Sequence, residues 1–134
     1  MFKRLIKSTL LRSPKEKMIQ YVTGILSKKN NKNIRATISG FDSPKRAIRK
    51  STGEAYIPEV TAEKGGQLRL FAVETKDSLN QEELEARWKL FSDCAKQNDA
   101  LFYIVFPQGM VATIKDKLEE FDDIEANLWQ AAKR

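Results

Sequence analysis

Three ionisable residues lie close together around one short stretch of the chain and could do chemistry jointly: Glu59, Glu74 and Lys76. They belong to IPEVTAEKGGQLRLFAVETK, in which two runs of apolar and β-branched residues flank Gly65-Gly66. Such runs around a glycine pair predict a β-hairpin. Two carboxylates brought together in a sheet repel each other unless one is protonated or a cation lies between them. The spacing therefore indicates a site that holds a cation or a proton.

The register of the hairpin decides whether the two acids meet. If the two glycines form the loop, the numbers of facing residues sum to 131, which places Glu59 opposite Ala72. Glu59 and Glu74 are then diagonal neighbours on one face, at a Cα separation of roughly 7 to 8 Å. Because side chains alternate along a strand, Lys76 is expected on the same side as Glu74.

The chain contains no histidine. This excludes Ser-His-Asp and Cys-His catalysis as well as histidine-ligated metals. Two carboxylates suit Mg²⁺ or Mn²⁺, which take oxygen ligands and keep several waters. Lys76 beside such an ion could hold or deprotonate a metal-bound water, or offset charge on a phosphate; simple salt bridges to the acids are the alternative.

The first half of the chain predicts a helix and a strand. Ser13-Pro14, with Glu16 three residues after the serine, is typical of a capping box, and apolar residues at helical spacing continue to residue 28. The β-branched run over residues 34–41 predicts a strand. The basic segment over residues 42–54 predicts a loop.

After the hairpin, the pattern predicts a helix capped by Asn80, with Leu84, Trp88 and Phe91 on its buried face. Residues 100–107 have no polar alternation and predict a strand covered on both faces. One or two helices are expected in the tail, residues 109–134. The order helix, three strands, helix, strand indicates an α/β domain with a mixed sheet and helices on its faces.

Length and charge bound the function. A chain of 134 residues fits one domain, residues 1–134, and its single cysteine predicts a reducing, cytoplasmic environment. Residues 1–53 hold 14 Lys and Arg against 2 Asp and Glu, whereas residues 54–134 hold 10 against 16. The charges of +12 and −6 sum to the net +6. A basic half beside an acidic half predicts a nucleic-acid partner, whereas the absence of a long apolar run argues against a membrane partner.

The motif as a whole resembles a known family. Pro58-Glu59, then fourteen residues, then Glu74-Thr75-Lys76 is similar to the signature of the PD-(D/E)XK nuclease superfamily, including its restriction-endonuclease-like and archaeal Holliday junction resolvase-like members. The resemblance implies a three-layer α-β-β-β-α-β core over about residues 13–108, followed by extra C-terminal helices. It further implies Glu59, Glu74 and the Thr75 carbonyl as ligands of Mg²⁺ or Mn²⁺, with Lys76 as the catalytic lysine. One departure is Glu59, where the family usually has aspartate.

Further candidates lie outside the motif. Several family members place another acid on the first helix, where Glu16 is the only candidate, although its capping role explains it without catalysis. Arg87 occupies a position on the second helix that is polar in some related enzymes, and a solvated or salt-bridged arginine is the alternative. A basic cluster is expected to contact phosphates beside the scissile one: Lys45, Arg46, Arg49 and Lys50.

These observations predict a divalent-metal-dependent nuclease that hydrolyses DNA phosphodiesters, with branched or junction DNA among its expected targets. By analogy, a homodimer is expected because so small a domain has one hydrolytic centre for a two-stranded substrate. The alternative is a nucleic-acid-binding or assembly module that keeps the nuclease fold and no longer cleaves. A third alternative is a protein-interaction domain that uses its acidic C-terminal half.

Overall fold

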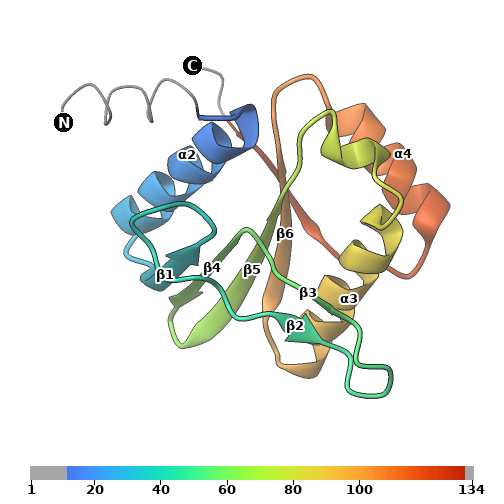
Figure 1. Ribbon diagram of the computed structural model, residues 1–134, viewed down its shortest axis with the longest axis horizontal. Coiled ribbons are helices and arrows are strands. Elements are labelled where there is room, and N and C mark those ends of the chain that lie inside the picture. Colours follow the sequence, from blue (N-terminus) through green and yellow to red (C-terminus); the bar gives the residue numbers. More distant parts are fainter. Residues whose placement is uncertain (1–11, 132–134) are drawn as a thin grey trace.

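The computed structural model describes residues 12–131 of the chain. A mixed five-stranded sheet forms the central layer, with one helix on its first face and two helices on its second (Figure 1). The helices are α2 (Pro14–Lys28), α3 (Leu84–Gln97) and α4 (Val111–Phe121), with a short 3-10 turn, η1 (Ser78–Asn80). The predicted α/β class, with a mixed sheet and helices on both faces, is confirmed.

The sheet combines an antiparallel meander with two parallel strands. Its order is β1-β4-β5-β6-β7, in which β1, β4 and β5 pair antiparallel and β6 and β7 continue parallel to β5. The strands are β1 (Lys32–Ala36), β4 (Val60–Lys64), β5 (Gln67–Val73), β6 (Leu101–Phe106) and β7 (Asn127–Gln130). Helix α3 makes the crossover from β5 to β6, as parallel pairing requires.

The first helix begins as the sequence predicts. Ser13 Oγ accepts a hydrogen bond from the Glu16 backbone N–H at 3.1 Å, and the Glu16 carboxylate accepts one from the Ser13 N–H at 3.0 Å. This capping box satisfies two of the N–H groups that a helix start leaves unpaired. Ile19, Val22 and Leu26 then pack against the sheet.

The hairpin of β4 and β5 has the predicted register. Val60 faces Phe71 and Lys64 faces Gln67, so facing residues sum to 131. Gly65 and Gly66 have φ angles of 60° and 80°, which glycine adopts without the steric penalty of a Cβ atom. On β5, Leu70 and Ala72 pack toward α3, whereas Phe71 and Val73 pack toward α2.

The segment between the first two strands of the meander differs from its prediction. The strand expected over residues 34–41 ends at Ala36, because the chain folds back and the Ala36 N–H donates to the Asp42 carbonyl at 3.1 Å. The loop expected over residues 42–54 contains β2 (Ala47–Ile48). This strand pairs with β3 (Ala55–Tyr56) as a separate two-stranded sheet against α3.

The predicted cap at Asn80 is wrong. Asn80 ends η1, and α3 begins four residues later, at Leu84. The Leu79 N–H donates to the Thr75 carbonyl at 3.2 Å, so the chain forms a tight turn directly after β5 and only later starts the helix. The polar groups of this turn lie close to the candidate site described below.

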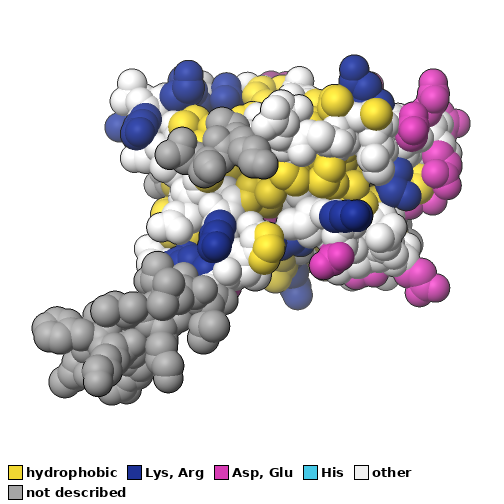
Figure 2. All heavy atoms as spheres, turned by 90° about the horizontal axis from the view of Figure 1, so that it is seen from above, with side chains coloured by type: hydrophobic (Ala, Val, Ile, Leu, Met, Phe, Trp, Pro, Cys, Tyr) yellow, Lys and Arg dark blue, Asp and Glu magenta, His cyan; other side chains and the backbone are white. Residues whose placement is uncertain are grey.

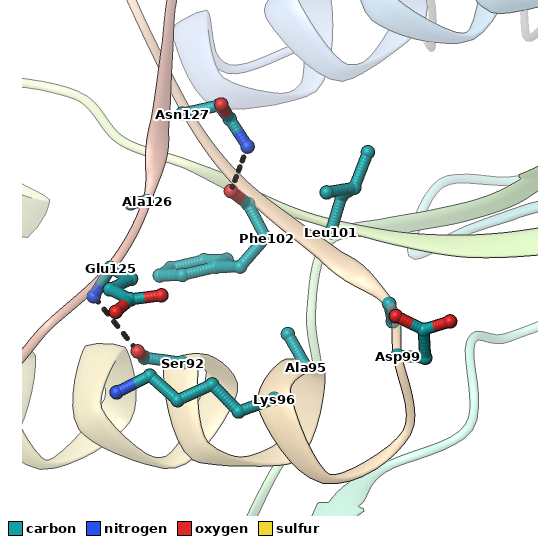
Figure 3. Close-up of a pocket in the computed structure, with 10 residues that line it drawn as sticks. Ser92, Ala95, Lys96, Asp99, Leu101, Phe102, Glu125, Ala126 and Asn127 are labelled. Atoms are coloured by element: carbon teal, nitrogen blue, oxygen red, sulfur yellow. Dashed lines mark hydrogen bonds between the residues drawn. The ribbon is translucent and has the colours of Figure 1, made fainter.

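The second helix expected in the tail is also wrong. After α4, residues 127–130 form β7, parallel to β6. The segment docks through two hydrogen bonds visible in Figure 3: the Glu125 N–H donates to the buried Ser92 Oγ at 2.9 Å, and Asn127 Nδ2 donates to the Phe102 carbonyl at 3.4 Å. Leu128 packs toward α3 and α4, and Trp129 packs toward α2. Strand β7 therefore contributes half-buried side chains to both faces of the sheet.

The outermost residues of the predicted single domain, 1–11 and 132–134, lie outside the described part. Within residues 12–131, no helix combines the length and apolar character that crossing a membrane would need.

Candidate functional site

Glu59 lies immediately before β4. Its Oε1 accepts a hydrogen bond from the Val73 backbone N–H at 2.7 Å, so the carboxylate takes up a donor of β5 just beyond the end of the hairpin ladder. Its Oε2 lies 3.6 Å from Nζ of Lys15, in the first turn of α2, and its side chain is 14% exposed. Glu59 therefore joins the end of the sheet to the helix that covers one face.

The pKa of Glu59 is raised above its ordinary value. Burial is the main cause, because a charged carboxylate loses its hydration, and the nearby charge of Glu74 adds to the effect. Lys15, the Val73 N–H and Arg87 each favour the charged form and together do not outweigh burial. Glu59 thus has a stronger tendency to hold a proton than an ordinary exposed glutamate.

Glu74 follows β5 directly and is fully buried. Its Oε1 accepts hydrogen bonds from Ser78 Oγ at 2.6 Å and from Arg87 Nη2 at 3.2 Å, and its Oε2 accepts one from Trp88 Nε1 at 2.8 Å. Arg87 is itself buried, with a side chain 8% exposed, so the two residues form a buried ion pair. Each carboxylate oxygen has at least one donor.

The structure brings the two predicted acids together. The alternation of β5 and the contacts of Glu74 with α3 place Glu74 on the α3 side of the sheet, and the two carboxyl groups are close enough for one charge to raise the pKa of the other. Lys15 from α2 and Arg87 from α3 supply one positive charge each. The cluster therefore balances two acids with two bases.

The remaining predicted catalytic residues lie differently. Lys76 is exposed in the turn after β5, and the ion pairs found among residues 12–131 do not include it. Glu16 is exposed and engaged in the capping box. The Thr75 carbonyl accepts from the Leu79 N–H at 3.2 Å and lies 3.1 Å from Ser78 Oγ.

Sequence reasoning missed several partners of the acids. Lys15 and Ser78 carried no recognised signal, and Trp88 was expected only as a core residue, which it also is at 0% exposure. Arg87 was singled out, and the salt-bridged alternative describes its contact with Glu74. A search for polar residues one helical turn from each acid would have found Ser78, because it lies four positions after Glu74.

A divalent ion would have to compete with protein hydrogen bonds at this site. Glu74 Oε1 accepts two hydrogen bonds, whereas Glu74 Oε2 accepts one and the Thr75 carbonyl accepts one from the Leu79 N–H. Glu59 Oε2 is the most available atom, since its ion-pair partner, Lys15 Nζ, lies 3.6 Å away. In the described part of the chain, no three His, Cys, Asp or Glu side chains gather as a metal-binding group.

A basic cavity of about 300 Å³ lies on the α3-facing side of β1, β4 and β5, next to β2 and α3. Arg35, Lys45 and Arg46 line it, together with Asn33 and Glu63, which hydrogen-bond each other at 3.1 Å. Arg35 donates to the Ser43 carbonyl at 3.2 Å, and no ion pair within residues 12–131 involves any of the three cations. The cavity thus presents a local excess of positive charge.

The predicted basic cluster is divided between two environments. Lys45 and Arg46 belong to the basic cavity, whereas Arg49 and Lys50 line a neighbouring cavity of about 470 Å³ against α3. Arg49 Nη1 bonds Asp93 at 2.9 Å and its Nε lies 3.5 Å from Glu54. The pKa of Arg49 is raised, mainly by the hydrogen bond with Asp93, so its charge is already matched.

The charge asymmetry of the sequence is visible on the surface. Figure 2 looks onto the end of the molecule at which β5 and β6 finish; the acidic side chains gather mostly beside α4, whereas Lys and Arg dominate the half that contains α2.

Comparisons of the chain with protein-family models, curated proteins and solved structures give no match.

Proposed function

We propose that the chain is a nucleic-acid-binding module that keeps a PD-(D/E)XK-type core. Its acid cluster, formed by Glu59 and Glu74 with their basic partners, holds α2 and α3 against the sheet. The basic cavity formed by Arg35, Lys45 and Arg46 is the observation that carries this proposal. Clustered cations without carboxylate partners release counterions from a phosphate backbone and contribute affinity that does not depend on sequence.

The order of elements supports the PD-(D/E)XK-type core. Helix α2 precedes the β1-β4-β5 meander, and helix α3 connects β5 to the parallel strand β6. This is the α-β-β-β-α-β order that the sequence resemblance implies. The strand β7 extends the sheet beyond that core.

The contacts of the acids support the structural role. Lys15 and Arg87 supply the positive charges that a metal ion would supply in an open carboxylate site, and Trp88 and Ser78 hold the Glu74 oxygens in place. A carboxylate bound by three protein donors needs no further cation to offset its burial.

A salt titration of DNA binding tests the proposal. Fluorescence anisotropy of a labelled duplex should show affinity that falls steeply with salt, and replacing Lys45 and Arg46 together by alanine should lower the slope of log K against log salt by about 2. Lys89→Ala, on α3 and paired with Glu85, is the matched control and should leave the slope unchanged. An unchanged slope in the double variant would contradict the proposal.

A second candidate is the divalent-metal-dependent nuclease acting on DNA, as an endo- or exonuclease and as a homodimer. The proximity of Glu59 to Glu74 favours it, together with the single long contact that Lys15 makes with Glu59. In that case Mg²⁺ or Mn²⁺ would take the place of Lys15 at Glu59, and Glu74 would have to give up a donor.

Incubation with branched, linear and single-stranded DNA in Mg²⁺, Mn²⁺ or EDTA separates the two candidates. Cleavage that requires metal and is lost in Glu59→Gln and Lys76→Ala would establish the nuclease. Binding without cleavage, unchanged in Glu59→Gln and insensitive to EDTA, is the result expected from the binding module.

A further inference from the structure

A third cavity, distinct from the acid cluster, lies on the α2-facing side of the sheet, opposite the basic cavity. Its volume is about 370 Å³, within the range of small-molecule sites. Residues of α2, of the turn that follows it, and of β4, β5, β6 and β7 line this cavity.

Aromatic rings form one wall of this aromatic cavity. Phe71 and Tyr103 stack with ring centroids 5.0 Å apart, and Trp129 meets Phe71 edge-on at 6.0 Å. Tyr21 tilts against Trp129 at 6.5 Å. Phe71 is buried, whereas the other three rings keep part of their surface exposed. Partly exposed rings on a rigid sheet offer faces on which a planar ligand can stack.

Positive charge surrounds these rings. Lys29 and Lys64 are exposed, and the Arg69 guanidinium lies 5.8 Å from the centroid of the Tyr103 ring. None of the described lining residues is acidic, and none of these three cations takes part in an ion pair within the described residues. The ligand chemistry that matches this combination is an aromatic group joined to an anion.

Two buried polar atoms of the lining residues have no hydrogen-bond partner. Asn31 is 7% exposed; its Nδ2 donates to the Leu26 carbonyl at 3.0 Å, which leaves the acceptor Oδ1 unpaired. The donor Nε of Arg69 is unpaired as well. Unpaired buried polar atoms destabilise a protein, and both of these belong to residues that line the cavity.

We propose that the aromatic cavity binds one unpaired nucleotide, with the base stacked against Trp129 and Tyr103 and the phosphate held by Lys29, Lys64 and Arg69. Nucleobases supply the flat ring and the donor and acceptor edge, and their phosphates supply the anion. The inference rests on the proposed nucleic-acid partner, but it uses residues that the basic cavity does not share. A single-stranded segment and a free nucleotide have this chemistry in common.

Tryptophan fluorescence reports on ligand binding at this site. Trp129 lines the cavity and is partly exposed, so a ligand can quench its emission, whereas Trp88 is fully buried. Titration with a 12-residue single-stranded oligodeoxynucleotide should quench the emission, and Trp129→Phe should abolish the quenching. Titration with dAMP separates the two sources: comparable affinity identifies a free nucleotide as the ligand, and much weaker affinity identifies a single strand. Absence of quenching by both ligands would overturn the proposal.

Variants of exposed residues at the edge of the cavity distinguish a loss of binding from a change in folding. Lys29→Ala, at the C-cap of α2, should weaken single-strand binding and lower its salt slope by about 1, whereas Lys28→Ala, at the last residue of α2 and outside the cavity, should not. Trp129→Leu should weaken single-strand binding at least about fivefold and leave duplex binding unchanged. Equal effects of Lys28→Ala and Lys29→Ala would overturn the site. The role of the basic cavity is tested independently, by the salt slope of duplex binding in the Lys45 and Arg46 double variant.

Discussion

The buried ion pair of Glu74 and Arg87 makes a sharp prediction about stability. Replacing Arg87 by methionine keeps an apolar stem of similar length and leaves the fully buried Glu74 without its counter-ion. Breaking a buried ion pair from one side typically costs about 3 to 5 kcal/mol. We expect the lower end, about 3 kcal/mol, because Ser78 and Trp88 still donate to the carboxylate and because the substitution also removes the unpaired Arg87 Nε.

The same helix supplies a matched control. Lys89 and Glu85 form an exposed ion pair at 3.3 Å on α3, and such pairs are worth about 0.3 to 0.5 kcal/mol. Lys89→Met should therefore change stability several times less than Arg87→Met. Adding Glu74→Gln to Arg87→Met removes the uncompensated charge and should recover about 2 kcal/mol of the loss.

Urea unfolding followed by far-ultraviolet circular dichroism measures these differences without relying on Trp88. The slope of the free energy of unfolding against urea should stay constant, so that shifts in midpoint report stability alone. If Arg87→Met shifted the midpoint no more than Lys89→Met, Glu74 would not depend on its counter-ion, and the structural role proposed for the acid cluster would fail.

Three further predictions use the same measurement. Gly66→Ala, at φ 80°, should cost about 1 to 2 kcal/mol, whereas Gly24→Ala, inside α2 with open space around it, should stabilise by up to about 1 kcal/mol; equal effects would contradict the turn geometry. The pKa of Glu59 in the folded chain lies above its ordinary 4.5, so the folded chain keeps a proton that the unfolded chain releases. The stability of Glu59→Gln relative to wild type should therefore increase as pH rises from about 4.5 through the raised pKa. A constant difference in stability across about pH 4 to 8 would show that the pKa is not raised. Ser92→Ala removes the acceptor of the Glu125 N–H and should cost about 1 to 3 kcal/mol; a loss below about 0.5 kcal/mol would mean that this contact does not anchor β7.

Local signals account for the parts of the fold that the sequence predicted. The capping box of Ser13 and Glu16 is complete within four residues, and the turn at Gly65-Gly66 fixes the register of both strands that it joins. The same register predicted one shared face for Glu59 and Glu74, but Glu59 lies outside the ladder and pairs with Lys15 of α2, whereas Glu74 contacts α3. The capping box and the turn needed no information from distant residues, which is why they could be predicted.

The missed features depend on distant partners. Ile124, Leu128 and Trp129 suit a helical stripe as well as a strand, and the choice is made by pairing with β6, more than twenty residues earlier in the chain. Lys15 meets Glu59 across 44 positions of sequence. A residue pattern cannot distinguish a lysine that reaches a buried carboxylate from one that remains in water until the packing of the layers is known.

The position of the acid cluster explains why its charges suit the docking of the helices better than the binding of a metal ion. Lys15 belongs to α2 and Arg87 to α3, and these helices cover opposite faces of the sheet. Both reach carboxylates at the same end of the β4–β5 hairpin, so the pair of acids connects all three layers through one ion pair at 3.6 Å and one charged hydrogen bond at 3.2 Å. A cation that bound there would have to compete with the contacts that dock the helices. Metal affinity and helix docking would then oppose each other, whereas neither the basic cavity nor the aromatic cavity is lined by Lys15 or Arg87.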